Sequence, residues 1–79
     1  MDEEIVLIAG DILVHYEINE IGLLVNRFDV LHDSEYPLWA WDILWVGSEA
    51  QEYGRRQAYT EEGLMRLIIT GVFIHYKSN

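Results

Sequence analysis

The chain of 79 residues contains no cysteine and a single proline. The lack of cysteine excludes disulfide bonds, thiolate metal ligands and a cysteine nucleophile, and with them the cross-links that stabilise many small secreted domains. No segment approaches the roughly 18 uninterrupted apolar residues of a membrane-spanning helix. Met1 is followed by three acidic residues, whereas a signal peptide begins with basic ones. We therefore expect neither export nor membrane insertion.

Basic residues are also scarce, because five lysines and arginines stand against fourteen aspartates and glutamates, for a formal net charge of -9. Clustered cations supply most of the affinity of proteins for nucleic acids and for anionic membranes, so this balance predicts binding to neither. Two interpretations of the acidity stay open. Either it keeps the protein soluble, or it imitates a phosphate backbone and occupies a basic site on another protein.

Apolar residues are abundant, at 51% of the chain, and they include three tryptophans and five tyrosines. Disordered chains lack the apolar side chains that offset the entropy of folding, so we expect a globular protein. The length is well below the roughly 150 residues typical of one domain. Residues 1–79 are therefore expected to form a single domain, which is too small for a two-domain enzyme with its site in a cleft.

Alternation of apolar and polar residues, bounded by turn residues, predicts a mainly β fold. A short helical or 3-10 turn is expected near residues 61–65, because Thr60 is suited to cap it and Gly63 weakens anything longer. A capped helix over residues 61–69, ended by Gly71, is the alternative. The expected strands cover residues 11–16, 21–30, 38–46, 55–59 and 68–76, the last with a break at Gly71.

The third expected strand has the clearest pattern. Its period of two places Trp39, Trp41, Ile43 and Trp45 on one face and Asp42 on the other. Burying an unpaired carboxylate costs several kcal/mol, so the face with Asp42 is expected to be partly solvated. The tryptophan face is therefore predicted to point into the core. Gly22, in the strand before it, indicates a bulge or a close approach of the backbone.

Four segments, GDILV (residues 10–14), IGLLV (21–25), WDILW (41–45) and YTEEGL (59–64), follow one another in an order that resembles small SH3-like barrel proteins of tailed bacteriophages. The resemblance covers most of residues 9–69 and concerns a fold more than an activity. It implies a small five-stranded SH3-like barrel with one short helical or 3-10 turn before the last strand. It also implies a bacteriophage protein, located in the virion or the host cytoplasm.

Residues suited to catalysis are present but not in catalytic patterns. His15, His32 and His75 lie far apart in the chain and form no metal-ligand spacing, so no metal site and no cofactor are expected. The adjacent carboxylates Glu61 and Glu62 are expected to be solvated, and no serine stands in a nucleophile motif. We therefore expect no catalytic residues and no enzyme. A small hydrolase would need a histidine and carboxylates to converge in a pocket.

Aromatic residues give the best indication of function, because Tyr and Trp at a surface are common anchors of protein interfaces. Tyr36, Trp39, Tyr53 and Tyr59 lie in or beside the two loops that flank the third strand. They are the predicted partner-binding residues of a non-enzymatic protein-binding or assembly module, a virion component or adaptor that docks on a phage structural or host protein. The alternative is an acidic inhibitor that mimics nucleic acid and blocks a host enzyme. The sequence does not indicate an oligomeric state.

Overall fold

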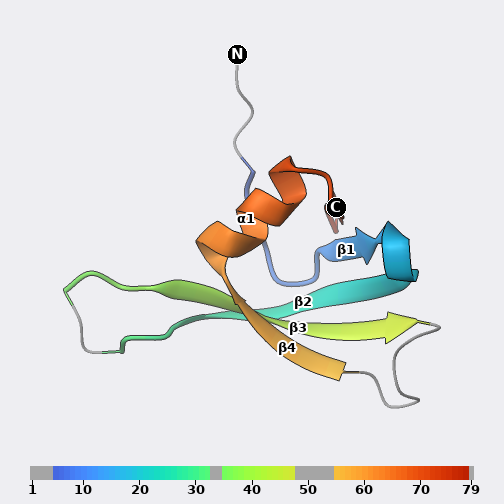
Figure 1. Ribbon diagram of the computed structural model, residues 1–79. Coiled ribbons are helices and arrows are strands. Elements are labelled where there is room, and N and C mark those ends of the chain that lie inside the picture. The colour runs from blue at the N-terminus through green and yellow to red at the C-terminus, as the bar shows by residue number, and fades with distance from the viewer. Residues whose placement is uncertain (1–4, 33–34, 48–54, 79) are drawn as a thin grey trace.

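The computed structural model describes residues 5–32, 35–47 and 55–78, which form one sheet and one α-helix (Figure 1). The expectation of a mainly β fold is confirmed. The elements in chain order are β1 (Ile12–His15), the 3-10 helix η1 (Tyr16–Ile18), β2 (Glu20–Asp29), β3 (Trp39–Gly47), β4 (Arg55–Thr60), α1 (Glu61–Ile69) and β5 (Phe73–Tyr76).

The five strands form a single antiparallel sheet in the order β4-β3-β2-β1-β5. Strands β1 to β4 follow one another as a meander, and β5 returns to pair with β1 at the other end. The sheet is open, because β4 and β5 are its two edges and no pairing joins them in the described part of the chain. The structure therefore shows an open five-stranded sheet. It does not show the closed barrel that the sequence resemblance implies.

Strand β2 is irregular near its middle, where its register with β3 shifts between Leu24 and Asn26. Such a bulge bends a strand and increases its local twist. Gly22 lies opposite Trp45, and a Cβ atom at Gly22 would come within 2.8 Å of the indole ring. The predicted close approach at Gly22 is confirmed, and only glycine leaves room for the tryptophan at this point.

The helix is longer than the single turn expected at residues 61–65, and the alternative capped helix is the correct one. Thr60 caps it, since its Oγ1 accepts a hydrogen bond from the Gly63 backbone N–H at 3.1 Å. Leu64 is completely buried, and the neighbouring apolar residues of α1 pack against the core. Burial of this face outweighs the β preference of Ile68 and Ile69, so the last strand is the shorter β5.

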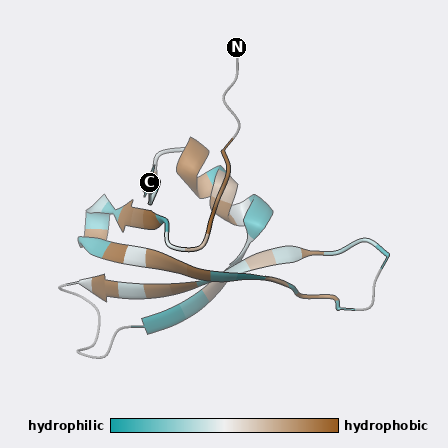
Figure 2. Cartoon of the chain, turned by 180° about the vertical axis from the view of Figure 1, so that it is seen from behind, coloured by the Kyte–Doolittle hydropathy of each residue, from teal (hydrophilic) through white to brown (hydrophobic). Residues whose placement is uncertain are grey.

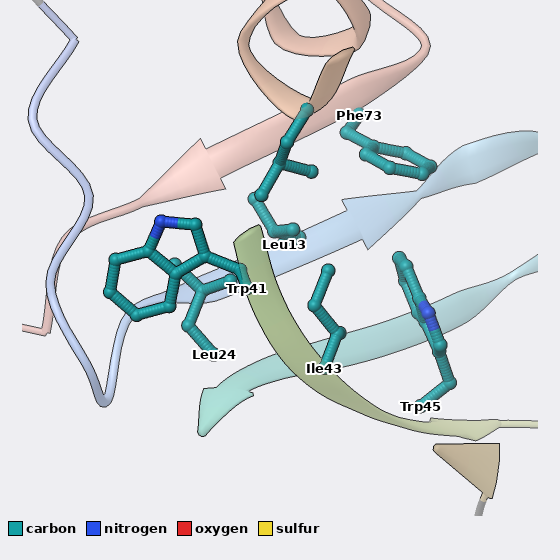
Figure 3. Packing of buried hydrophobic residues seen from close by; sticks show 7 residues of the cluster. Leu13, Leu24, Trp41, Ile43, Trp45 and Phe73 are labelled. Atoms are coloured by element: carbon teal, nitrogen blue, oxygen red, sulfur yellow. The ribbon is translucent and has the colours of Figure 1, made fainter. Parts of the chain in front are cut away.

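The core lies between α1 and one face of the sheet (Figure 3). The predicted inward positions of Trp41, Ile43 and Trp45 are confirmed, because each is at most 2% exposed. Trp39 shares their parity but is 36% exposed. It pairs with Asp29 at the start of β3, where the Arg27 guanidinium covers its ring at 4.0 Å. The buried cluster consists of Leu13, Leu24, Trp41, Ile43, Trp45, Leu64 and Phe73.

Candidate protein-binding surface

The face of the sheet turned away from α1 is also apolar. Cross-strand partners point to the same side of a sheet, so the strand registers show which residues share this face. Leu13 in β1 and Ile43 in β3 are buried in the core. The residues just before and just after each of them along the strand therefore point to the other face of the sheet. One outward row crosses four strands and consists of Tyr76, Ile12, Leu23 and Leu44.

A second row runs parallel to the first, one pleat along the strands, and consists of Ile74, Val14, Ile21 and Val46. The eight residues of the two rows are called the outer apolar face below. In Figure 2, β1 and much of β2 and β3 are coloured as hydrophobic, whereas β4 is mostly hydrophilic. In Figure 1, α1 lies on the other side of the sheet.

The outer apolar face is accessible to solvent. Ile21, Leu23, Val46 and Tyr76 are between 38% and 48% exposed, and the other four residues are half-buried. Among the outward positions of the described strands, only Asp42 and Arg56 are charged, and they form an ion pair at 2.7 Å. Large contiguous apolar surfaces on soluble proteins often mark interaction sites, so the outer apolar face is the candidate surface here.

The sequence carried one signal of this face, since residues 21–25 are apolar at successive positions and alternation is absent there. A strand that is apolar on both faces is typical of burial on both sides. The partner-binding residues predicted from the sequence were aromatic ones, not the aliphatic residues of this face. Which aliphatic residues lie side by side depends on the register of four strands, and only the structure gives that register.

The predicted partner-binding residues do not all lie on one exposed surface. Tyr36 is 78% exposed and, like Trp39, belongs to the region where β2 connects to β3. Tyr59 is half-buried and packs edge-on against Phe73, with 5.8 Å between ring centroids, and burial raises the pKa of its phenol. Tyr53 lies outside the described residues. The proposal of a docking surface built on all four therefore stays a prediction.

A buried carboxylate joins distant parts of the chain. Asp11, 1% exposed, accepts hydrogen bonds from the backbone N–H groups of Ile8 (3.1 Å) and Ser78 (3.0 Å) and lies 2.7 Å from His75 Nε2. Burial alone would raise the pKa of Asp11, but the hydrogen bonds of His75, Ser78 and Ile8 outweigh it and lower that pKa. The arrangement connects the segment before β1 to β5 and the residues after it.

A histidine beside a carboxylate is also the kind of pair that the hydrolase alternative requires. Neither Asp11 nor His75 lines either of the two described cavities, and Ser78 contributes its backbone N–H here. The contacts that the pair makes connect the segment before β1 to β5 and the residue Ser78. No cluster of three or more histidine, aspartate or glutamate side chains suited to a metal ion occurs within residues 5–32, 35–47 and 55–78.

A second polar cluster lies beside α1. Glu61 accepts hydrogen bonds from the Arg27 guanidinium (2.8 and 3.1 Å) and from the Trp41 indole Nε1–H (2.8 Å). The hydrogen bonds from Arg27 lower the pKa of the Glu61 carboxyl, and the same interaction raises the pKa of Arg27. These groups border a shallow cavity of about 320 Å³, lined by Ile5, Val6, Leu7, Arg27, Trp41, Glu61 and Met65.

The carboxylate of Glu61 in this cavity is already paired with Arg27 and Trp41, so it is not left unpaired for a ligand. The buried carboxylate of Glu20 is likewise matched by Arg55 at 2.8 Å. Among described buried side chains, one polar atom, Nε1 of Trp45, has no hydrogen-bond partner. It belongs to the core, where Trp45 packs against Phe73, and not to a surface.

Comparison of the chain with protein-family models, curated proteins and solved structures found no match. The described helices include none with the length and apolar character needed to cross a membrane.

Proposed function

We propose that this protein is a non-enzymatic protein-binding module that docks on another protein through its outer apolar face. One observation carries the proposal: eight apolar side chains from four strands share the face of the sheet opposite α1, and half of them are exposed. Folding alone does not require them, because the core lies on the other face. Removing such a patch from water by binding is favourable.

The finer proposal for the fold is an SH3-like barrel. The meander of β1 to β4, the return of β5 to β1, the helix between β4 and β5 and the bulge in β2 all support it. The resemblance to small phage barrels is the basis of a narrower proposal, a virion component or adaptor acting in the virion or host cytoplasm. A non-enzymatic role is supported by the Asp11–His75 pair, which lies outside both described cavities.

The alternative of an acidic nucleic-acid mimic needs carboxylates spaced like phosphates on one surface. Several described carboxylates are already paired: Asp42 with Arg56, Glu20 with Arg55, and Glu61 with Arg27. Paired carboxylates present less negative charge to a basic partner. The described residues thus favour docking through apolar contacts over mimicry.

The test is a quantitative pull-down from the native source with Ile21→Thr. Threonine keeps the β-branched shape that suits a strand while replacing apolar surface by a hydroxyl. Ile69→Thr is the matched control, because Ile69 is 73% exposed at the end of α1, away from the outer apolar face. We expect a partner retained by the wild type and by Ile69→Thr to fall about tenfold with Ile21→Thr.

Two results would contradict the proposal. If Tyr36→Ala removes the partner and Ile21→Thr does not, docking occurs at the connection between β2 and β3. If charge reversal at Glu61 and Glu62 removes it while Ile21→Thr has no effect, the acidic mimic replaces the docking module. Melting temperatures of all variants, measured in parallel, separate loss of binding from loss of the fold.

A further inference from the structure

We infer that the free edge of β4 is a self-association site, at which the chain pairs antiparallel with β4 of a second copy about a twofold axis. The inference concerns a surface other than the outer apolar face and does not depend on the proposed function. Three observations on β4 carry it: which backbone groups lie on its free side, where its two arginines point, and which residues a twofold pairing places opposite each other.

The hydrogen bonds of β2 show to which side each of its residues points. Successive residues of a strand direct their backbone N–H and C=O groups to opposite neighbours. Leu24 bonds through both its N–H and its C=O to the segment just before β1. The preceding residue, Leu23, therefore directs its backbone groups to β3, where it pairs with Leu44. The backbone groups of Leu44 accordingly face β2.

The same alternation continues across β3 to β4. Because Leu44 faces β2, the adjacent Ile43 faces β4, where it pairs with Gln57. Gln57 is thus bonded to β3, and its neighbours Arg56 and Ala58 direct their N–H and C=O groups to the free side of β4. No described backbone group outside the strand pairings bonds to either of them, and Figure 1 shows β4 as the outermost strand at its end of the sheet. An extended strand satisfies such a row of groups.

The devices that usually protect a sheet edge are missing from β4. Residues 55–60 contain no proline, and their register with β3 runs without a bulge. Arg55 points back across the sheet to Glu20 on β2, at 2.8 Å. Arg56 likewise contacts Asp42 on β3, at 2.7 Å. Edge charges usually repel an approaching strand, but these two are neutralised over the sheet and away from the free side.

A second copy fits this edge because β4 is complementary to itself. The antiparallel register that places Gln57 opposite Gln57 of the second copy also places Arg56 opposite Ala58 on both sides of the axis. Each of these two pairs can exchange backbone hydrogen bonds in both directions, since both residues face the free side. Arg55 comes to lie opposite Tyr59, so no two charges of the same sign meet. The two Gln57 amides can donate to and accept from each other.

Net charge and length determine how strong this association is. Each chain carries a formal net charge of -9, which opposes the dimer and is screened by salt. A ladder of six residues on each strand buries less surface than a stable dimer does, so we expect association at about 0.1–1 mM protein. Cross-strand partners share a face, so the outer apolar faces of both copies would lie on the same side of the joined sheet.

The experiment uses the whole chain and two variants of Ala58. Ala58→Pro removes the N–H that faces the free side, and proline is accommodated at such positions because the N–H takes no part in the ladder with β3. Ala58→Ser keeps the N–H and is the matched control. Sedimentation equilibrium from about 20 µM to about 1 mM protein, at low and at moderate salt, measures association. Amide hydrogen exchange, followed by NMR, distinguishes Arg56 from Gln57.

We expect the wild type and Ala58→Ser to dimerise alike, and Ala58→Pro at least about tenfold more weakly, because each copy loses a hydrogen bond and gains a ring at the edge. Association of the wild type should strengthen with added salt. Exchange of the Arg56 amide should slow as the protein concentration rises. The Gln57 amide, bonded to β3, should be protected at every concentration.

Three results would overturn the inference. The first is a wild type that stays monomeric up to about 1 mM. The second is a dimer that Ala58→Pro leaves intact, and if Ile21→Thr dissociates that dimer, the second copy lies on the outer apolar face instead. The third is an Arg56 amide that exchanges equally fast in monomer and dimer, a measurement that needs no variant. The pull-down with Ile21→Thr tests the proposed function separately, so either can fail without the other.

Discussion

Asp11 shows what a single residue contributes to this fold. Its carboxylate is buried, yet it has three partners. The backbone N–H groups of Ile8 and Ser78 donate hydrogen bonds to it, and the His75 ring nitrogen Nε2 lies within hydrogen-bond distance. A buried carboxylate without partners would be strongly destabilising, whereas one with such partners orders the segments that provide them. Asp11 therefore holds the residues before β1 and those after β5 in place.

Asp11→Asn is expected to lower the free energy of unfolding at pH 7 by about 1–3 kcal/mol, because buried donors lose a charged acceptor. The pKa of Asp11 is lowered from its ordinary value of 3.8, so its ionised form is favoured in the folded protein. Its contribution is therefore fully present above about pH 4 and is lost as pH falls through the folded pKa. Urea unfolding at pH 7 and at steps down to pH 3 measures both effects.

The exposed Glu62 provides the matched carboxylate control for this experiment. Glu62→Gln should leave stability at pH 7 nearly unchanged and keep the acid sensitivity of the wild type. In Asp11→Asn the stability lost between pH 5 and pH 3 should be smaller than in the wild type. Parallel pH curves for Asp11→Asn and the wild type would show that Asp11 does not contribute in its ionised form.

At the scale of elements, α1 determines which face of the sheet becomes the core. It follows β4 without a loop, and its cap, Thr60, is also the last residue of that strand. Glu61 then fixes the start of α1 to the sheet through Arg27 on β2 and Trp41 on β3. The helix therefore covers the tryptophan face and leaves the outer apolar face accessible.

Thr60→Ala is expected to destabilise the protein by about 1 kcal/mol, because the Gly63 N–H loses its acceptor at the beginning of α1. Thr60→Ser keeps the hydroxyl and should retain most of the stability. Urea titration with circular dichroism at 222 nm measures the difference. Equal midpoints for the alanine and serine variants would mean that burial of Leu64 alone determines the start of the helix.

At the scale of the whole molecule, net charge and the outer apolar face are the two properties from which partners are expected. The formal net charge of -9 is expected to repel polyanions, and burial of the outer apolar face against another apolar surface is expected to be favourable. Three of the five cations in the chain, Arg27, Arg55 and Arg56, are engaged with carboxylates. Their positive charge is therefore partly offset, which is one reason to expect weak interaction with a phosphate backbone.

We expect no binding to duplex or single-stranded nucleic acid at about 0.15 M salt, where the Debye length is about 8 Å and repulsion from the acidic chain still acts at contact. A mobility shift assay with mixed-sequence oligonucleotides tests this. Sub-micromolar binding to any of them would contradict the expectation.

The sequence alone determined the local properties of this protein. Alternation in β3 predicted the burial of Trp41, Ile43 and Trp45, because the extended backbone directs successive side chains to opposite faces. Gly22 likewise indicated a bulge or a close approach of the backbone, and a close approach to Trp45 is what the structure has there. These features depend on backbone geometry over a few residues, so they can be recognised without knowing what packs against them.

The tertiary structure decided the properties that depend on contacts between distant residues. The length of α1 depends on burial of Leu64 and its neighbours against the sheet, which local propensity does not describe. Asp11 and His75 are 64 positions apart in the chain and meet because β5 pairs with β1. The outer apolar face exists because three strand registers align Ile12, Leu23 and Leu44 with their neighbours, and register follows from the packing of the whole sheet.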